Sequence, residues 1–321
     1  MSAPREKQLS ADNRRVLHEL TRELRSKGCD ATEATSAAYL EGVLCFQRYL
    51  VSQDRRPDIL AASRADVQDW LIYLATPADR DGAGRAQGSI RGWFASLRRV
   101  YNYAVAEEMI AASPMAGMTS PPESEAPIPV PDTGAIRAVL AAVSADKTWM
   151  GRRDEAIIRL FCQAGAPRAS EMAGLLAADV DLDADLVTVR GKQANGREKI
   201  RQFPLEPKTA RAFSRWARAR ARRPGADVSP WWFLGVKGRM TRSGMYQMTE
   251  RRCAQAGVPR IHPHQFRHWS TDRMLDSGML EGQVMLLNGW TTRKMIDRYG
   301  RDRAGRRAGD AARRAGIGAV L

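Results

Sequence analysis

The chain has 321 residues, which is long enough for two domains that each bury a hydrophobic core. Hydrophobic residues make up 44% and charged residues 27%, as in an ordinary folded protein, but 51 lysines and arginines face 36 aspartates and glutamates, which gives a net charge of +15. This excess favours a polyanionic partner, and nucleic acid is the most common one.

An anionic membrane is the competing partner, but two sequence features argue against it. No apolar run approaches the roughly 20 residues of a spanning helix, and no signal peptide opens the chain. We therefore expect a cytoplasmic protein associated with the nucleoid. The four cysteines are scattered without a C-x-x-C pair, so we expect reduced thiols, no zinc and no disulfide framework: Cys29, Cys45, Cys162 and Cys253.

The N-terminal third is predicted to be helical. Residues 1–31 are polar, and we expect an extension with one short helix. From residue 32 apolar side chains recur on one helical face, at Tyr39, Val43, Phe46 and Leu50. A second helix should start at Ser63, with Asp66 as its reciprocal capping residue. A third, long helix bears arginines that face either solvent or DNA: Arg91, Arg98 and Arg99.

Six prolines lie between residues 114 and 131. Proline at this density forbids a helix and favours an extended, semi-rigid connector. We therefore predict a linker at 116–131 that separates a helical domain at 32–115 from a second domain that starts at 132.

The second domain is predicted to be mainly helical with a small β-sheet. Residues 185–190 and 199–205 have the pattern of strands, and Asn195-Gly196 between them is a strong hairpin signal. Residues 231–234 form a buried, strand-like segment. Thr241 can cap one of the helices. The helices are expected at 132–145, 151–164, from Ser170, and at 207–222, 241–256, 264–277, 281–287 and 292–300.

Three side chains near the C-terminus have properties suited to attack on a phosphodiester. His264 can exchange a proton near neutral pH. Arg267 stays charged and offers forked donors that match phosphate oxygens. Tyr299 becomes a nucleophile when nearby cations favour its phenolate. Each residue alone means little, so the interpretation depends on their spacing and on the rest of the chain.

Two segments resemble the signature boxes of the tyrosine recombinases, also called the phage integrase family. The first spans residues 164–171 and the second spans 264–299. The resemblance covers most of residues 150–300 clearly and the N-terminal helical domain more loosely. Its specific part is the spacing: 24 residues from Arg168 to Lys192, three from His264 to Arg267, 23 from Arg267 to Trp290 and nine from Trp290 to Tyr299.

The resemblance implies a role for each residue of these boxes. Tyr299 would be the nucleophile and would form a 3′-phosphotyrosyl link. Arg168 and Arg267 would hold the non-bridging oxygens of the scissile phosphate, where negative charge builds in the transition state. The His-Gln-Phe-Arg box has phenylalanine where leucine is usual, which changes a core side chain and leaves the chemistry untouched.

The resemblance also implies roles in proton transfer and in holding the site together. Lys192 would protonate the departing 5′ oxygen, with Lys199 in the same hairpin as the alternative. His264 would assist proton movement. Glu171 would support the site, or would serve only as an acidic residue at a helix start. Trp290 stands where histidine is more usual, and because its indole N–H donates but cannot shuttle a proton, we expect it to bind phosphate and to pack under the tyrosine helix.

The resemblance also implies a fold and an activity. It implies a mainly α protein with a small β-sheet, in which an α+β catalytic domain at 132–300 and a SAM-like core-binding domain clamp double-stranded DNA. We expect a phage or mobile-element integrase that acts as a homotetramer through a Holliday junction. No ATP or other cofactor is expected, because exchange of one phosphate ester for another keeps the bond energy. No metal is expected either, because guanidinium and ammonium groups supply the positive charge that Mg²⁺ brings elsewhere.

Several alternatives stay open at this stage. The chain could be a chromosome-dimer resolving, Xer-like recombinase, a type IB topoisomerase, or a DNA-binding protein on a decayed scaffold. The short N-terminal extension argues against a further arm-site domain, and an accessory directionality factor is an open partner. The basic tail at 301–321 either packs on a neighbouring protomer or frays. The arginines at 215–223 face solvent or the DNA backbone.

Overall fold

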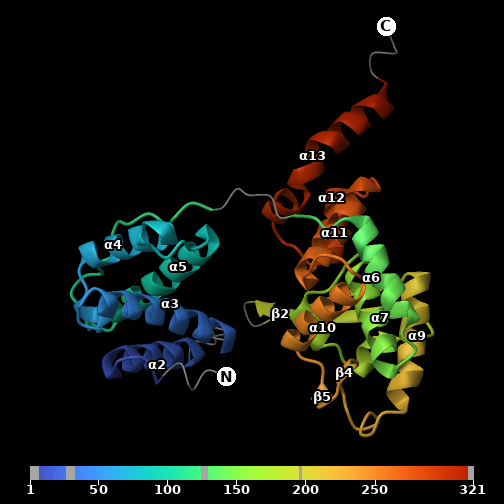
Figure 1. Cartoon of the computed structure of the whole chain (residues 1–321), viewed down its shortest axis with the longest axis horizontal. Coiled ribbons are helices and arrows are strands. Elements are labelled where there is room, and N and C mark those ends of the chain that lie inside the picture. Colours follow the sequence, from blue (N-terminus) through green and yellow to red (C-terminus); the bar gives the residue numbers. More distant parts are fainter. Residues whose placement is uncertain (1–6, 27–32, 124–128, 195–196, 317–321) are drawn as a thin grey trace. The chain divides into compact units, whose positions relative to one another are not determined.

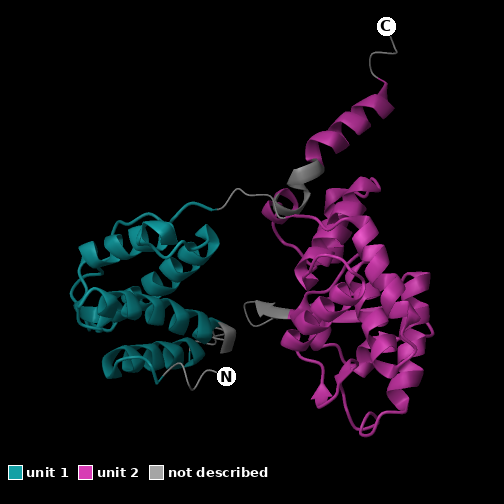
Figure 2. Ribbon diagram, in the orientation of Figure 1, with its two compact units in different colours: residues 1–126 teal, residues 127–321 magenta. Residues whose placement is uncertain are grey.

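A computed structural model describes residues 7–26, 33–123, 129–194 and 197–316. The side chains at 33–34, 192–194, 197–199 and 298–303 lie outside this description. The chain divides into two compact units, Met1–Ala126 (unit 1) and Pro127–Leu321 (unit 2), as Figure 2 shows. The described elements of unit 1 are helices, and unit 2 combines helices with two small antiparallel sheets (Figure 1). The predicted fold class, mainly α with a small β-sheet, is confirmed.

Unit 1 packs its helices around one hydrophobic core. The largest core side chains are aromatic, and the rings of Phe46 and Trp70 lie with their centroids 5.0 Å apart. Val16 and Leu20 belong to the same core, so the helix of the N-terminal extension is part of this bundle. The helices are α2 (Ala11–Ser26), α3 (Glu33–Ser52), α4 (Arg64–Ala75) and α5 (Gln87–Ala106), with 3₁₀ turns at Ile59–Ala61 and Ala78–Arg80.

The start of α4 confirms the predicted capping box. The backbone N–H of Asp66 donates to the Ser63 hydroxyl at 3.2 Å, and the Ser63 N–H donates to the Asp66 carboxylate at 2.7 Å. Two backbone donors that have no helical acceptor are satisfied in this way.

Unit 2 contains the remaining helices and both sheets. In the larger sheet β2 pairs with β1 and with β3, and Val189 lies opposite Arg201. The strands are β1 (Val180–Asp181), β2 (Leu186–Ala194), β3 (Arg197–Pro204), β4 (Leu234–Gly235) and β5 (Gly238–Arg239). The helices are α6 (Thr133–Ala145), α7 (Trp149–Phe161), α8 (Ala169–Ala173), α9 (Pro207–Ala221), α10 (Arg242–Gln255), α11 (Pro263–Asp276), α12 (Glu281–Asn288) and α13 (Lys294–Ala315), with a 3₁₀ turn at Ala177–Asp179.

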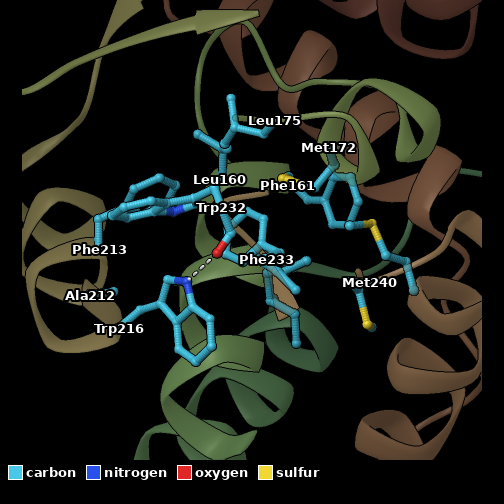
Figure 3. Close-up of a cluster of buried hydrophobic side chains, with 14 of the residues drawn as sticks. Leu160, Phe161, Met172, Leu175, Ala212, Phe213, Trp216, Trp232, Phe233 and Met240 are labelled. Carbon is cyan, nitrogen blue, oxygen red and sulfur yellow. Dashed lines mark hydrogen bonds between the residues drawn. The ribbon is translucent and has the colours of Figure 1, made fainter. Parts of the chain in front are cut away.

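An aromatic cluster forms the centre of the unit 2 core (Figure 3). Trp216 of α9 stacks on Phe233 and donates its indole N–H to the Trp232 carbonyl at 3.1 Å. The segment 231–234 is less strand-like than predicted. The Trp232 N–H donates to the Leu175 carbonyl at 2.8 Å, so this backbone bonds to the loop after α8 and only its last residue joins β4.

The last helix is longer than the sequence pattern predicted. We expected a helix at 292–300 and then a basic tail, but α13 continues to Ala315. Arg307 lies in this continuation and donates to Asp272 of α11 at 3.0 Å. Because the Asp272 carboxylate is buried, it gains from a nearby cation, which holds the tail against its own unit. Contact with a neighbouring protomer stays a prediction. Among the described helices, none is both long and apolar enough to cross a membrane.

Candidate active site

Arg168 and Glu171 lie at the start of α8, directly after a sharp turn. Gly165 has a φ of +78°, a conformation that favours glycine, and a Cβ there would lie 3.1 Å from the Phe203 ring. Glu171 accepts hydrogen bonds from the Arg168 backbone N–H at 2.8 Å and from its guanidinium at 2.7 Å. The carboxylate is almost buried, with its side chain 5% exposed, while the Arg168 side chain is 43% exposed. Glu171 thus fixes an arginine that solvent can reach.

Arg201 of β3 joins the same carboxylate, although the sequence analysis did not select it. Its Nη2 donates to Glu171 Oε2 at 2.7 Å, and its Nη1 donates to the Asn288 carbonyl at 2.7 Å. Side chains alternate along a strand, so Arg201 shares the buried face of β3 with Phe203. A cation on the buried face of a strand needs a buried partner. An arginine at an inward-facing position of a predicted strand was therefore the sequence signal that could have identified Arg201.

Arg267 lies on α11 and is only 1% exposed. Its Nη2 donates to the Asn288 carbonyl at 2.7 Å, and its Nη1 donates to the carbonyl of Ala166 in the turn before Arg168. The guanidinium carbon lies 5.6 Å from the centroid of the Trp290 ring. These contacts set the plane of the guanidinium. Because the side chain is buried, binding of a phosphate to Arg267 requires a local shift of the groups that cover it.

The end of α12 joins Arg201 and Arg267. The Asn288 carbonyl belongs to the last turn, which lacks helical donors and carries the negative end of the helix dipole. It accepts from both Arg201 and Arg267. Gly289 follows with a φ of +66°, and a Cβ there would lie 3.3 Å from Arg201 Nη1. A larger residue would therefore disturb both the helix end and the arginine beside it.

Hydrogen bonds to Glu171, Ala166 and Asn288 connect the arginines at the start of α8, on β3 and on α11. We call the connected groups the arginine network: Arg168, Glu171, Arg201, Arg267 and the Asn288 carbonyl. Of the residues predicted from sequence, Arg168, Glu171 and Arg267 belong to it, and Trp290 packs against it.

Other predicted residues lie nearby or outside the description. His264 is exposed in the first turn of α11, and its ring centroid lies 4.8 Å from that of His268 at nearly a right angle. Lys192 lies on β2 at an irregularity in the pairing with β3, and Tyr299 lies on α13. The side chains of Lys192, Tyr299 and the alternative Lys199 are outside the described part of the chain, so their roles stay predictions.

The electrostatics of the network favour an anion. Burial raises the pKa of Glu171, but the charge of Arg201, the Arg168 backbone N–H and the Arg168 guanidinium outweigh it, so the pKa lies below its ordinary value. Burial also lowers the pKa of Arg201, although the Glu171 charge opposes this shift. The network contains three guanidiniums and one carboxylate, which contacts two of them, and the excess positive charge suits a phosphate.

The described residues contain no cluster of potential metal ligands, and their cysteines are free thiols. No group of three or more histidine, cysteine, aspartate or glutamate side chains there could hold a metal ion. Cys253 is buried, and Cys45 and Cys162 are half-buried free thiols. Cys29 lies outside the described residues.

Together the fold and the site define a mainly helical protein in which one carboxylate and two backbone carbonyls hold a group of arginines. Residues 136–306 match the model of the phage integrase family. The chain belongs to this family, the tyrosine recombinases. Both signature boxes of the sequence lie within the matched residues.

Curated relatives carry the name tyrosine recombinase XerC. The protein of Azotobacter vinelandii is 33% identical over 199 residues, which cover 60% of this chain and 62% of that protein. The protein of Stutzerimonas stutzeri is 30% identical over 205 residues, which cover 62% and 64%. The protein of Pseudomonas aeruginosa is 30% identical over 229 residues, which cover 67% and 71%. The chain thus spans slightly less than two thirds of the first two relatives.

Solved structures of the same fold are bound to DNA. XerH site-specific recombinase bound to palindromic difH substrate has a TM-score of 0.68 at 14% identity and covers 91% of this chain and 83% of that one. A lambda integrase dimer bound to a COC′ core site has a TM-score of 0.65 at 12% identity, with 94% and 81% covered. The Tn1549 transposon integrase in complex with transposon right end DNA has a TM-score of 0.64 at 18% identity, with 93% and 98% covered. At these identities the likeness shows a shared fold.

Proposed function

We propose that this chain is a site-specific DNA recombinase of the integrase type, which cuts and rejoins strands through a covalent link to Tyr299. The observation that carries the proposal is the arginine network, in which Arg168 and Arg267 are bound to groups that hold their guanidiniums in place. A fixed pair of guanidiniums suits a phosphate whose non-bridging oxygens gain negative charge in the transition state. Glu171 supports this role, because it orients the more accessible arginine before substrate binds.

The proposed reaction exchanges one phosphate ester for another. The Tyr299 oxygen attacks phosphorus, the bond from phosphorus to the 5′ oxygen breaks, and the phosphate stays joined to the 3′ end and to the enzyme. The phenol proton passes towards His264, and the departing 5′ oxygen takes a proton from Lys192. Attack by a 5′ hydroxyl then reverses these steps and releases the tyrosine, so rejoining needs no nucleotide cofactor.

The proposed partner is double-stranded DNA, and the proposed assembly is a homotetramer that passes two duplexes through a Holliday junction. The relatives described above are named as recombinases, and the solved structures of the same fold described above are complexes with DNA. The net charge of +15 also favours a polyanion. A phage or other mobile element is the proposed source of the substrate sites, with an accessory directionality factor as an open partner.

A chromosome-dimer resolving, Xer-like recombinase is the second candidate. The observation that favours it is that the relatives described above are named XerC. Both candidates share the chemistry, so only the DNA site separates them. A repeated attachment core in DNA beside the gene would favour the integrase, whereas exchange at a single chromosomal site would favour the Xer-like protein.

A suicide substrate tests the reaction. Duplex DNA from beside the gene is nicked next to the scissile phosphate, so that the released fragment diffuses away and the covalent adduct accumulates. We expect an adduct with the wild type and none with Tyr299→Phe, while the control Tyr73→Phe in unit 1 keeps it. An adduct with Tyr299→Phe, or attachment mapped to another residue, would refute the proposed nucleophile.

A further inference from the structure

A second concentration of positive charge lies between α7 and α9, and its residues are not part of the arginine network. It is a cleft of about 490 Å³, which we call the basic cleft. In Figure 1, α9 lies at the opposite side of unit 2 from the β2 label. Six of the eight lining residues are cations: Lys147, Arg152, Arg215, Arg218, Arg222 and Arg223.

Within the described residues, most of these cations form no ion pair. Arg215 donates to the buried Glu155 at 2.8 Å, a carboxylate that it shares with Arg159, so Arg215 has a partner within the fold. In the described part of the chain no ion pair forms at the other arginines of the cleft, which are Arg152, Arg218, Arg222 and Arg223. Like charges gathered in one concave site raise its positive potential, because low-dielectric walls focus the field. An anionic ligand would relieve this repulsion.

The spacing along α9 suits a linear polyanion. Arg215, Arg218 and the C-cap residue Arg222 follow at intervals of three and four residues, so they continue one face of the helix. At a rise of about 1.5 Å per residue the row is about 10 Å long. Successive phosphates of one DNA strand advance by about 3.4 Å along the duplex axis, so the row spans about three nucleotides. The whole of α9 contains no acidic residue that would interrupt it.

The Trp149 ring holds one guanidinium of the cleft, that of Arg223, in place. The Arg223 guanidinium carbon lies 3.9 Å from the centroid of the Trp149 ring, which is close stacking. A stacked guanidinium loses less rotational freedom when it binds a ligand, and its N–H groups still point outward from the ring edge. Apart from Trp149, only Ala219 contributes an apolar side chain to the lining. A protein interface has an apolar core, whereas a nucleic-acid interface is polar and positively charged, so the lining favours DNA.

We propose that the basic cleft is a second DNA-binding surface, which holds the sugar-phosphate backbone of a duplex segment outside the cleavage site. Contacts of this kind position DNA and do not read its sequence. Such a surface would let the protein hold flanking DNA while another segment occupies the arginine network. The proposal does not depend on strand cleavage, so it can fail or succeed separately from the role of Tyr299.

Photo-crosslinking from the cleft is the direct test. Full-length protein with Tyr299→Phe carries p-benzoylphenylalanine at position 219, and the probe is a labelled duplex of random sequence. The control carries the same group at position 221, which is exposed and lies about 200° around α9. We expect crosslinks from position 219 and few from position 221. Equal crosslinking from both, or none from position 219 while the duplex stays bound, would overturn the proposal.

A matched pair of variants, one that removes two charges and one that keeps them, provides the second measurement. Arg218→Gln/Arg222→Gln removes two contacts, so the slope of log affinity against log salt should fall by about two, and affinity for the random duplex by at least about tenfold at low salt. Arg218→Lys/Arg222→Lys should keep most of both. Circular dichroism checks that each variant is folded. An unchanged slope in the glutamine variant, or displacement of the crosslink by polyglutamate but not by excess duplex, would contradict a DNA-binding cleft.

Discussion

Two arginine-rich regions of unit 2 differ in how their charges are held. In the arginine network Arg267 is buried and the Arg201 side chain is only 11% exposed, and Glu171 and the Asn288 carbonyl accept their N–H groups. In the basic cleft Arg218 and Arg222 are exposed. Fixed guanidiniums can stabilise charge that develops at one position, because no reorganisation is needed during the reaction. Mobile guanidiniums suit a ligand that slides, such as a DNA backbone.

The difference teaches that the number of cations does not define a catalytic site. Both regions would attract a phosphate, but in the network a buried carboxylate and backbone carbonyls hold the guanidiniums, whereas in the cleft Arg218 and Arg222 are exposed. Substitutions in the network should therefore change reaction rate and stability together. Substitutions in the cleft should change DNA affinity alone, and the predictions that follow test this separation.

The largest effect is expected from Arg267→Lys. A lysine cannot donate to the Ala166 and Asn288 carbonyls and also face a phosphate with a planar fork. Loss of one preorganised donor at a developing oxyanion typically costs about 10²–10³ in rate. We expect a decrease of at least this size in single-turnover cleavage of the suicide substrate.

A buried arginine outside the network provides the matched control for Arg267→Lys. Arg252 of α10 is also buried and donates to Asp154 at 2.8 Å. Arg252→Lys should lower stability but leave the cleavage rate of the folded protein near that of the wild type. Equal rate losses in the two variants would mean that Arg267 acts only through folding.

A smaller effect is expected from Glu171→Gln, which leaves Arg168 and Arg201 without their carboxylate. Removal of one partner from a buried ion pair costs about 3 kcal/mol, because the remaining charge is uncompensated. Urea denaturation at neutral pH measures this loss. Glu155→Gln removes another buried carboxylate of unit 2 and should lose comparable stability without slowing cleavage. If Glu155→Gln also slowed cleavage, the cleavage rate would depend on the stability of the fold and not on Glu171 itself.

The pH dependence sharpens the Glu171 prediction. The pKa of Glu171 is lower in the folded state than its ordinary value, so its carboxylate stabilises the fold fully above about pH 4.3, the usual glutamate pKa. This contribution is lost as the pH falls through the lowered, folded-state pKa. The stability difference between wild type and Glu171→Gln should therefore shrink in acid. Asp146 and Glu155 also have lowered pKa values, so the difference between proteins, and not the wild-type curve alone, is the measurement.

The smallest effect on stability is expected in the basic cleft. Arg218→Gln/Arg222→Gln removes exposed charges that form no ion pair with the residues that the structure describes, and surface substitutions of this kind usually change stability by less than about 0.5 kcal/mol. Relief of like-charge repulsion could even raise the melting temperature slightly. Thermal denaturation without DNA gives the result. A loss comparable to that of Glu171→Gln would mean that the cleft arginines are part of the fold.

Features that depend on residues close to each other in the chain could be predicted from the sequence. The Ser63 cap of α4 and the Thr241 cap of α10 are each made within three residues of chain. Apolar periodicity located the helices, because a helix repeats every 3.6 residues whatever it packs against. The end of α13 was not predictable in this way, since Arg307 holds the helix through Asp272, 35 residues earlier.

The amino-acid order thus established the fold class, the family resemblance and the candidate residues of both signature boxes, since these follow from local periodicity and from intervals along the chain. The network itself depended on folding. Arg201 and Arg267 meet at one carbonyl although they lie 87 and 21 residues from Asn288, and no local pattern encodes such a meeting. The physical reason is that a buried cation must find an acceptor wherever packing brings one, and packing is a property of the whole unit.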